Sequence, residues 1–185
     1  MSKAIVFLAD GCEECEALLV VDLLRRAGVT VLTAAVSKNG SQGSTEIVSS
    51  HNVRICADTT AEQAEYDDAE LLVLPGGMPG TINLGGHPIV REQCLRFAEN
   101  RRIAAICAAP SVLGSLGILT GKKATCYPGF EEKLTEAEAT GEKVTVSGNI
   151  TTGRALGAAM DFALELISQL EGKEAAEKVK RSICL

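Results

Sequence analysis

The sequence predicts an α/β fold in which a mostly parallel β-sheet carries helices on both faces. Short apolar runs of the kind found in buried strands alternate with segments of helical periodicity from the start of the chain. Strands separated by helices of about 10 to 15 residues form right-handed βαβ units, and such units build a parallel sheet. No repeat, low-complexity tract or linker interrupts the 185 residues, so we expect one domain over 1–185.

The expected elements follow one another in a regular order. The first half is expected to contain strand 4–9, helix 13–27, strand 29–36, a turn at 38–43, hairpin strands 47–48 and 53–56, a helical capping box at 59–63 and strand 69–74. The second half is expected to contain helix 87–100, strand 103–106, a helix from 110 to about 116, an extended piece at 125–128, a helical turn at 131–134, a β pair at 144–146 and 149–152, and helices 155–170 and 173–182. Because ligands bind at the carboxyl ends of parallel strands, the turns that follow three of these strands should meet at one functional edge.

Composition and charge exclude several classes of partner. Lys and Arg total 18 against 24 Asp and Glu, which gives a net charge of -6, and Trp is absent. The basic and aromatic surfaces that bind nucleic acid are therefore not expected. No apolar stretch approaches the roughly 18 residues of a membrane helix, and segment 4–9 is bounded by Asp10 and Gly11 without a cleavage-site pattern. We expect a cytoplasmic protein that binds neither nucleic acid nor membrane.

Seven cysteines are many for this chain, and the odd number leaves at least one thiol unpaired. Structural disulfides are rare in the reducing cytosol, so each thiol is expected to be either reactive or buried. Cys12 and Cys15 form a Cys-x-x-Cys pair, but without a second pair a zinc site is disfavoured, and no metal is expected. Packing is the main interpretation of this pair. The alternative is a redox role, in which Cys12 resolves an oxidised thiol as a disulfide.

Cys107 stands between the predicted strand 103–106 and a helix that Pro110 begins. This is the layout of a nucleophile elbow, in which a sharp turn lifts one side chain out of the sheet edge. A lone Cys beside Ile and Ala is more often a small core residue, so its surroundings must decide. A helix start lowers the pKa of a thiol below its usual value of about 8.5, which would favour the thiolate.

Two further features are expected at the same edge of the sheet. Glu16 lies within the first turn or so of the helix that follows strand 4–9. Gly76 and Gly77 follow strand 69–74, where backbone N–H groups without an obstructing Cβ suit an oxyanion hole. Together with Cys107, these residues predict a reactive thiol at the carboxyl edge of the sheet.

Five segments, which span nearly the whole chain, occur in an order typical of one superfamily. They are 11–17 (GCEECEA), 21–28 (VDLLRRAG), 73–77 (VLPGG), 104–110 (AAICAAP) and 161–164 (DFAL). At these residues the chain resembles the ThiJ/PfpI (DJ-one) superfamily, and it is most similar to the branch that contains the Parkinson-disease protein deglycase. The resemblance implies a flavodoxin-like three-layer sandwich that is usually a homodimer.

The resemblance also implies roles for the site residues. Cys107 would be the nucleophile, held in a strained backbone, and a protonated Glu16 would hydrogen-bond its sulfur. The N–H groups of Gly77 and Ala108 would bind the oxyanion, with Gly76 beside them at the substrate. The implied activity needs no cofactor and converts small α-oxoaldehydes (methylglyoxal, glyoxal) to hydroxy acids, or performs a related deglycation. In it the thiolate adds to the aldehyde and Glu16 moves a proton between the two carbons.

The chain departs from that branch at the position where a His usually precedes a Pro after the elbow helix. Tyr127 occupies this position, before Pro128, and a phenol with a usual pKa near 10 is a poor base at neutral pH. The protease-like branch has a His directly after the Cys, where this chain has Ala108. Losing a general base weakens the steps that it serves by about a hundredfold. We therefore expect slow catalysis that relies on Glu16, with Tyr127 in the place of the His.

Neither histidine of the chain fills these positions. His87 stands at a helix start, where a solvated or capping role is expected, and His51 falls near a family Arg that reaches the partner subunit. The missing base leaves a second function open, which is a non-enzymatic redox sensor or stress-response chaperone acting through oxidation of Cys107. Proteolysis is disfavoured because no His follows the Cys.

Overall fold

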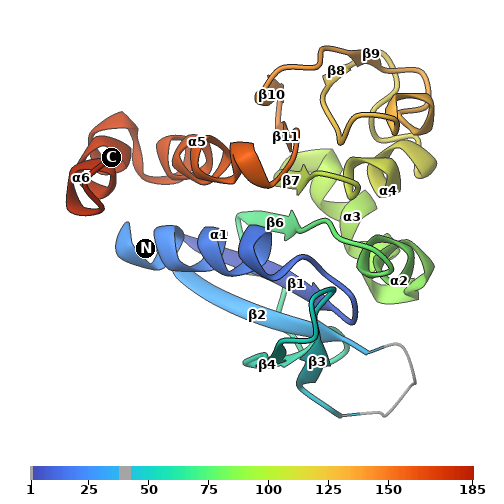
Figure 1. Cartoon of the computed structure of the whole chain (residues 1–185), viewed down its shortest axis with the longest axis horizontal. Helices are drawn as coiled ribbons and strands as arrows, with labels where there is room; N and C mark the ends of the chain where they lie inside the picture. The colour runs from blue at the N-terminus through green and yellow to red at the C-terminus, as the bar shows by residue number, and fades with distance from the viewer. Residues whose placement is uncertain (1, 38–42) are drawn as a thin grey trace.

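The computed structural model describes residues 2–37 and 43–185, and its centre is a seven-stranded sheet (Figure 1). The strands are β1 Lys3–Ala9, β2 Thr30–Val36, β5 Thr59–Thr60, β6 Leu71–Leu74, β7 Arg102–Ile106, β10 Val144–Ser147 and β11 Ile150–Gly153. They lie in the order β10-β11-β7-β6-β1-β2-β5. Every pairing in this sheet is parallel except that of β10 with β11, so the prediction of a mostly parallel sheet is confirmed.

Helices cover both faces of the sheet. One face carries α1 (Glu14–Arg26), α5 (Ala159–Glu171) and α6 (Lys173–Ser182), and the other carries α2 (Gly80–Gly86), α3 (Pro88–Asn100) and α4 (Pro110–Ser115). The alternation of side chains along β1 explains this arrangement. Ala4, Val6 and Leu8 pack with the first group of helices, whereas Ile5 and Phe7 pack with the second. A strand buried on both faces must be apolar throughout, and the result is the expected three-layer sandwich.

Two small sheets lie outside the central one. β3 (Glu46–Val48) and β4 (Arg54–Cys56) form the predicted antiparallel hairpin, and β8 (Lys123–Ala124) pairs in parallel with β9 (Glu138–Ala139). Short 3-10 helices lie at η1 (Glu131–Lys133) and η2 (Leu156–Ala158). Within the described parts of the chain, no helix combines the length and the apolarity that crossing a membrane requires.

The capping box predicted at 59–63 is wrong. Thr59 and Thr60 instead form the edge strand β5, which pairs with residues 34–35 of β2. The N–H of Ala61 continues this pairing by donating to the carbonyl of Ala35 at 2.9 Å. Tertiary pairing has therefore overridden a local signal for a helix start.

Two further local features differ from the prediction. The helix α2 was not predicted because its sequence, GTINLGG, has a weak intrinsic helix propensity. The piece at 125–128 is irregular, and the strand pairing lies just before it, in β8. Most of the turn predicted at 38–43 falls on residues 38–42, which lie outside the described residues.

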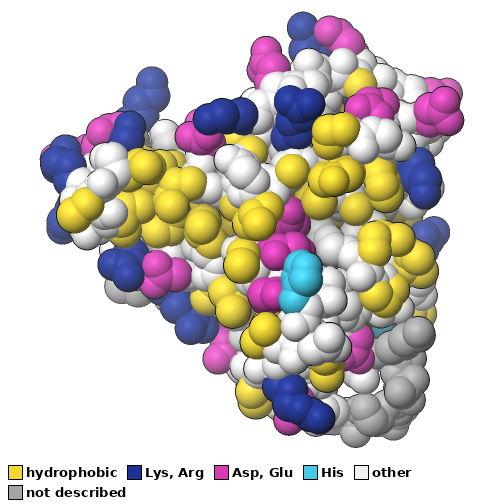
Figure 2. Space-filling view, viewed as in Figure 1, with side chains coloured by type: hydrophobic (Ala, Val, Ile, Leu, Met, Phe, Trp, Pro, Cys, Tyr) yellow, Lys and Arg dark blue, Asp and Glu magenta, His cyan; other side chains and the backbone are white. Residues whose placement is uncertain are grey.

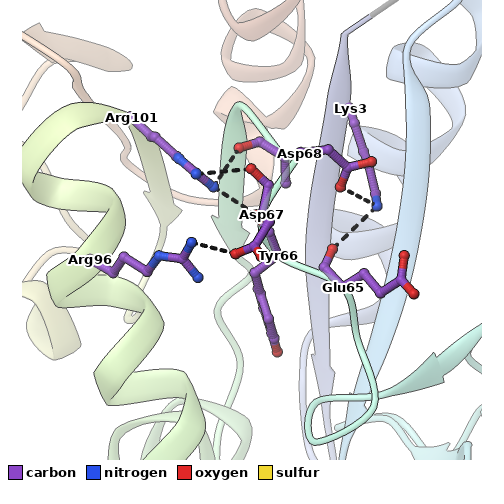
Figure 3. A network of polar contacts seen from close by, with 8 residues as sticks. Lys3, Glu65, Tyr66, Asp67, Asp68, Arg96 and Arg101 are labelled. Carbon is purple, nitrogen blue, oxygen red and sulfur yellow. Dashed lines mark hydrogen bonds and ion pairs between the residues drawn. The ribbon is translucent and has the colours of Figure 1, made fainter.

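A network of polar contacts lies at the amino-terminal edge of the sheet (Figure 3). Lys3, the first residue of β1, places Nζ 2.6 Å from Asp68 Oδ1. The Arg101 guanidinium donates to the carbonyls of Tyr66 (2.6 Å) and Ala69 (3.1 Å) in the loop that leads into β6. These bonds satisfy loop carbonyls at the edge opposite to the predicted reactive thiol, so their role is structural.

Candidate active site

The carboxyl ends of β1, β6 and β7 meet where the strand order reverses. β1 lies between β2 and β6, and the helices that follow β1 and β6 cover opposite faces, which opens a crevice at this edge. Backbone bonds tie the loops together here. The N–H of Glu13 donates to Gly76 O at 2.9 Å, and the N–H of Gly80 donates to Gly11 O at 3.0 Å. The third turn lies against the second, because a Cβ on Gly76 would stand 2.6 Å from the Cβ of Cys107, so the predicted meeting of the three turns is present.

Cys107 occupies a left-handed backbone conformation at the end of β7, with φ of 64°. Such a conformation is strained for a residue with a side chain and persists where its surroundings fix it. Here the N–H of Cys107 donates to Gly153 O at 2.9 Å, and its carbonyl accepts from Tyr127 N–H at 2.8 Å. These two bonds fix the elbow on both sides, and Cys107 is partly buried at the turn.

Glu16 is almost completely buried, with 1% of its surface exposed. Its side chain hydrogen-bonds Cys107, and its Oε2 accepts from the N–H of Gly76 at 3.0 Å. The N–H of Leu156 also donates to this carboxyl group. Burial, the largest effect, raises the pKa of Glu16 to about 7. A glutamic acid that holds its proton near neutral pH can both donate to a thiolate and accept a proton from substrate.

Glu13 positions this helix, a role that the sequence pattern did not reveal. It is the N-cap residue of α1, and its Oε2 accepts from the backbone N–H of Glu16 at 2.6 Å. The bond satisfies one of the free N–H groups at the helix start. It therefore fixes the backbone from which Glu16 reaches the thiol.

The expectation that the helix start gives Cys107 a low pKa is wrong. Burial and then the charge of Glu16 raise the pKa of the Cys107 thiol to about 12, against the opposing effect of N–H donors from Ala108 and Gly77. The helix α4 has only six residues, so its dipole is small. Once this pair of acids has lost one of its two protons, the two groups share the other, and placing it on Glu16 removes the carboxylate charge that disfavours the thiolate.

Glycine is required at both predicted oxyanion positions. A Cβ on Gly76 would lie 2.6 Å from the Cβ of Cys107 and 2.7 Å from Glu16 Oε2. A Cβ on Gly77, whose φ is +90°, would lie 2.3 Å from the N of Glu13. The absence of side chains lets this loop approach both reactive groups, and the N–H groups of Gly77 and Ala108 hydrogen-bond the sulfur. A site for a developing oxyanion next to the sulfur follows from this arrangement.

Tyr127 is tied to the site by its backbone. Its N–H bonds the carbonyl of Cys107, while its half-exposed ring packs edge-on against Phe130, with ring centroids 6.3 Å apart. The histidines lie elsewhere among the described residues. His87 precedes α3 without a side-chain cap bond and pairs with Glu62 at 3.1 Å, so the capping alternative is wrong.

The Cys-x-x-Cys pair divides between core and surface. Cys12 is completely buried, and burial raises the pKa of its thiol to about 12. Cys15 is exposed, and the neighbouring Glu13 carboxylate raises the pKa of its thiol. Both effects oppose the thiolate that redox exchange needs, which favours the packing interpretation for Cys12, whereas the exposure of Cys15 shows that packing is wrong for that residue.

One cluster near the site has the composition of a metal-binding group. Glu13, Glu14 and His51 each offer a ligand atom, and these atoms lie within 4.8 Å of one another. The sequence spacing could not reveal this group, because His51 comes from the hairpin connection between β3 and β4. His51 Nδ1 already contacts Glu14 Oε1 at 3.0 Å, so a direct contact between the two side chains accounts for the cluster.

Comparison with known proteins agrees with this architecture. Residues 2–169 match the model of the DJ-1/PfpI family. The chain belongs to this family. Protein dj-1beta of Drosophila melanogaster is 38% identical over 188 residues, which cover 99% of this chain and 97% of that protein. The crystal structure of Drosophila melanogaster DJ-1beta matches with a TM-score of 0.92 at 35% identity and covers 100% of this chain and 99% of its own.

Two other relatives bear on function. The glutathione-independent glyoxalase DJR-1.2 of Caenorhabditis elegans is 30% identical over 188 residues, which cover 100% of this chain and 96% of that protein. The structure of oxidized Toxoplasma gondii DJ-1 matches with a TM-score of 0.93 at 32% identity, covering 100% of this chain and 98% of its own. The DJ-1/PfpI family thus includes a glyoxalase, and the flavodoxin-like fold expected from the sequence is confirmed.

Proposed function

We propose that this member of the DJ-1/PfpI family is a cofactor-independent glyoxalase acting on small α-oxoaldehydes such as methylglyoxal and glyoxal, or on related glycated adducts. The observation that carries the proposal is the contact between Glu16 and Cys107 beside the N–H groups of Gly77 and Ala108. The similarity to the glyoxalase DJR-1.2 supports it.

The reaction requires one shared proton and one water molecule. The Cys107 thiolate adds to the aldehyde carbon, the N–H groups of Gly77 and Ala108 bind the new oxyanion, and Glu16 protonates it to a hemithioacetal. The Glu16 carboxylate then removes the hydrogen of that carbon as a proton and delivers it to the neighbouring carbonyl carbon, while the hydroxyl proton of the hemithioacetal passes to the oxygen of that neighbouring carbonyl. The first carbon is oxidised and the second reduced, which leaves a thioester. Water hydrolyses the thioester and releases the 2-hydroxy acid and the thiol.

The proposal is tested with purified protein and methylglyoxal. Cys107→Ala and Glu16→Gln should each lower the rate of hydroxy-acid formation by about a hundredfold or more, since one removes the nucleophile and the other the proton carrier. Cys184→Ala, which removes an exposed thiol near the C-terminus, is the matched control and should retain the wild-type rate. Equal rates in wild type, Cys107→Ala and Glu16→Gln would overturn the proposal.

Tyr127 makes this enzyme slow within the proposed mechanism. The phenol replaces the His of related proteins, so a base is missing for the steps that move protons to and from water. Tyr127→His should raise kcat for methylglyoxal about tenfold or more, and Tyr127→Phe should leave it close to wild type. A rate lost in Tyr127→Phe and not raised in Tyr127→His would instead make the phenol a catalytic residue.

A second function, redox sensing or stress-related chaperone activity, is favoured by the partial exposure of Cys107. A peroxide would transfer one oxygen atom to the thiolate and leave as water or alcohol, and a second transfer would give the sulfinate. Mass spectrometry after mild peroxide treatment tests this function. Sulfinate at Cys107 without a Cys12–Cys107 disulfide would exclude Cys12 as a resolving thiol. An unmodified Cys107 would remove the second function.

The same proposal includes a cytoplasmic homodimer in which 1–185 forms one domain. The partly exposed Leu18 (40%) and Val53 (44%) are apolar residues of α1 and of the β3–β4 hairpin that a partner subunit would cover. Sedimentation should give twice the chain mass of 19.4 kDa. A monomer at micromolar concentration would contradict this part.

A further inference from the structure

A cavity of about 430 Å³ lies between α2, α4 and η1. Its wall includes Met78, Ile82, Gly85, Val112, Phe130 and Lys133. Figure 2 shows hydrophobic side chains gathered over α2 and, separately, over the region of β7 and α4. This cavity, which we call the tail pocket, plays no part in the thiol chemistry described above.

Three residues of its wall connect the tail pocket to the loops around the reactive thiol. Met78 directly follows Gly77, whose N–H hydrogen-bonds the Cys107 sulfur. Ser111, another wall residue, donates its hydroxyl to the carbonyl of Ala108 at 2.6 Å. Phe130 packs against Tyr127, whose N–H bonds the Cys107 carbonyl. These three links place the tail pocket next to the loops that hold the thiol.

The walls offer a ligand mostly apolar surface. Three wall hydroxyls are turned to the backbone: Thr81 donates to Gly77 O at 3.0 Å, Ser111 to Ala108 O at 2.6 Å and Ser115 to Val112 O at 2.8 Å. The side chain of Ile82, another wall residue, is exposed to 62% and adds to the apolar surface of the hollow. A large apolar hollow with satisfied polar groups is typical of a ligand site.

Lys133 supplies one cation at the edge of this apolar hollow. Its Nζ lies 4.9 Å from the centroid of the Phe130 ring. Among the described residues it forms no ion pair with a carboxylate. An anionic group on a ligand would complement this charge.

We propose that the tail pocket holds the side chain of the substrate, and that this side chain is an aryl or branched apolar group ending in a carboxylate. The inference rests on the proposed glyoxalase function, since the aldehyde end reacts at Cys107. The methyl group of methylglyoxal fills little of such a cavity. The tail pocket therefore makes a larger α-oxoaldehyde acid the preferred substrate class.

Gly85 allows the tail pocket to be filled without strain. A Cβ on Gly85 would meet Val112 Cγ2 at 3.5 Å, an ordinary contact, so Gly85→Leu places a side chain in the cavity. Gly86 is the next residue of α2, and a Cβ there meets nothing within 4 Å. Gly86→Leu adds the same atoms outside the cavity and is the matched control.

The test compares kcat/KM for methylglyoxal, phenylglyoxal and 4-carboxyphenylglyoxal. Wild type should prefer the carboxylated substrate. Gly85→Leu should lower kcat/KM for both aryl substrates relative to methylglyoxal by about tenfold or more, whereas Gly86→Leu should keep the wild-type ratio. Lys133→Gln should lower the ratio of carboxylated to plain aryl substrate by about fivefold. Wild-type ratios in Gly85→Leu would refute the placement of the substrate side chain in the tail pocket. A wild-type ratio in Lys133→Gln would refute the carboxylate at the end of that side chain.

A binding measurement separates this inference from the proposed function. Calorimetry with 4-carboxymandelate, the hydroxy acid of the third substrate, requires no turnover. One outcome is that wild type converts no aldehyde but binds this acid, and that Gly85→Leu raises Kd about tenfold. This result would refute the glyoxalase function and support the tail pocket as a binding site. Protein that converts methylglyoxal but binds the acid equally in wild type and Gly85→Leu would keep the glyoxalase and refute the tail pocket.

Discussion

Glu16→Gln should change the pH dependence of stability as well as activity. Burial raises the pKa of Glu16 from its ordinary value of 4.5 to about 7 in the folded protein. A group whose folded pKa lies above its unfolded pKa stabilises the fold fully below the unfolded value, and this contribution is lost as pH rises through the folded value. The free energy of unfolding should therefore lose the contribution of Glu16 between about pH 4.5 and about pH 7.

The size of the effect follows from the two pKa values. At about 1.4 kcal/mol for each tenfold change, the difference between 4.5 and about 7 corresponds to about 3 kcal/mol. Glu16 is 1% exposed, so solvent screening reduces this figure little. The pKa of Cys107 is also raised, so its contribution to stability is likewise lost as pH rises. This loss begins near the ordinary pKa of 9.0, above the pH range of the assay.

The assay is urea unfolding of wild type and Glu16→Gln from about pH 4.5 to about pH 8.5. The stability of wild type minus that of Glu16→Gln should fall by about 3 kcal/mol across this range, because groups common to both proteins cancel. Glu14→Gln is the matched control on the same helix. Despite some desolvation, hydrogen bonds from the backbone, Ser49 and His51 lower the pKa of Glu14, so its contribution changes only below about pH 4.5 and its difference curve should stay nearly flat across this range. A flat difference curve for Glu16→Gln would refute the protonated Glu16 and with it the shared proton.

Three further substitutions test one contact inside the site and two hydrogen-bonded contacts that stabilise the fold. Gly76→Ala should lower the rate of methylglyoxal conversion by about a hundredfold, because the new Cβ would lie 2.6 Å from the Cβ of Cys107 and displace the reacting groups. Gly86→Ala is its control, because a Cβ there meets nothing within 4 Å. Arg101→Met should lower the free energy of unfolding, measured in urea, by about 1–3 kcal/mol, because the carbonyls of Tyr66 and Ala69 lose their donor. Its control is Arg96→Met, which breaks an exposed ion pair and should lower the free energy of unfolding by less than about 1 kcal/mol. Thr152→Val should lower the free energy of unfolding by about 1–3 kcal/mol, because the buried N–H of Thr125 loses its acceptor at 2.9 Å. Thr152→Ser keeps the hydroxyl and should retain most of that stability. Equal stabilities in wild type and Thr152→Val would contradict the role of this hydroxyl.

The parts of the fold that the sequence predicted are those set by burial on both sides of a strand. Segment 4–9 is apolar throughout because each of its faces meets a helical layer, and such a run permits few alternatives. The turn at Cys107 was predictable for a related reason, since small residues between a buried strand and a Pro-started helix leave space for a sharp bend. These local patterns are sufficient to place the thiol at the sheet edge.

The remaining features depend on contacts between distant segments. The Gly-rich α2 forms where Gly80 must approach Cys12, because a Cβ there would lie 2.5 Å from the N of Cys12. The raised pKa of Cys107 depends on burial and on a carboxyl group 91 positions earlier in the chain, which is the separation of residues 107 and 16. Neither local propensity nor a helix start contains that information.

The arrangement around the sulfur also indicates which step of the proposed reaction would suffer from the missing His. Thiolate formation needs a proton acceptor in contact with Cys107, and Glu16 provides it from within the buried pair. Proton transfer between the two substrate carbons uses the same carboxyl group. Hydrolysis differs because a water molecule must be deprotonated, and the half-exposed Tyr127, which stands in the expected place of the His, is a poor base for this step. The first two steps therefore depend on Glu16, whereas the replaced His would chiefly have served the last, so a thioester at Cys107 should accumulate before hydroxy acid is released.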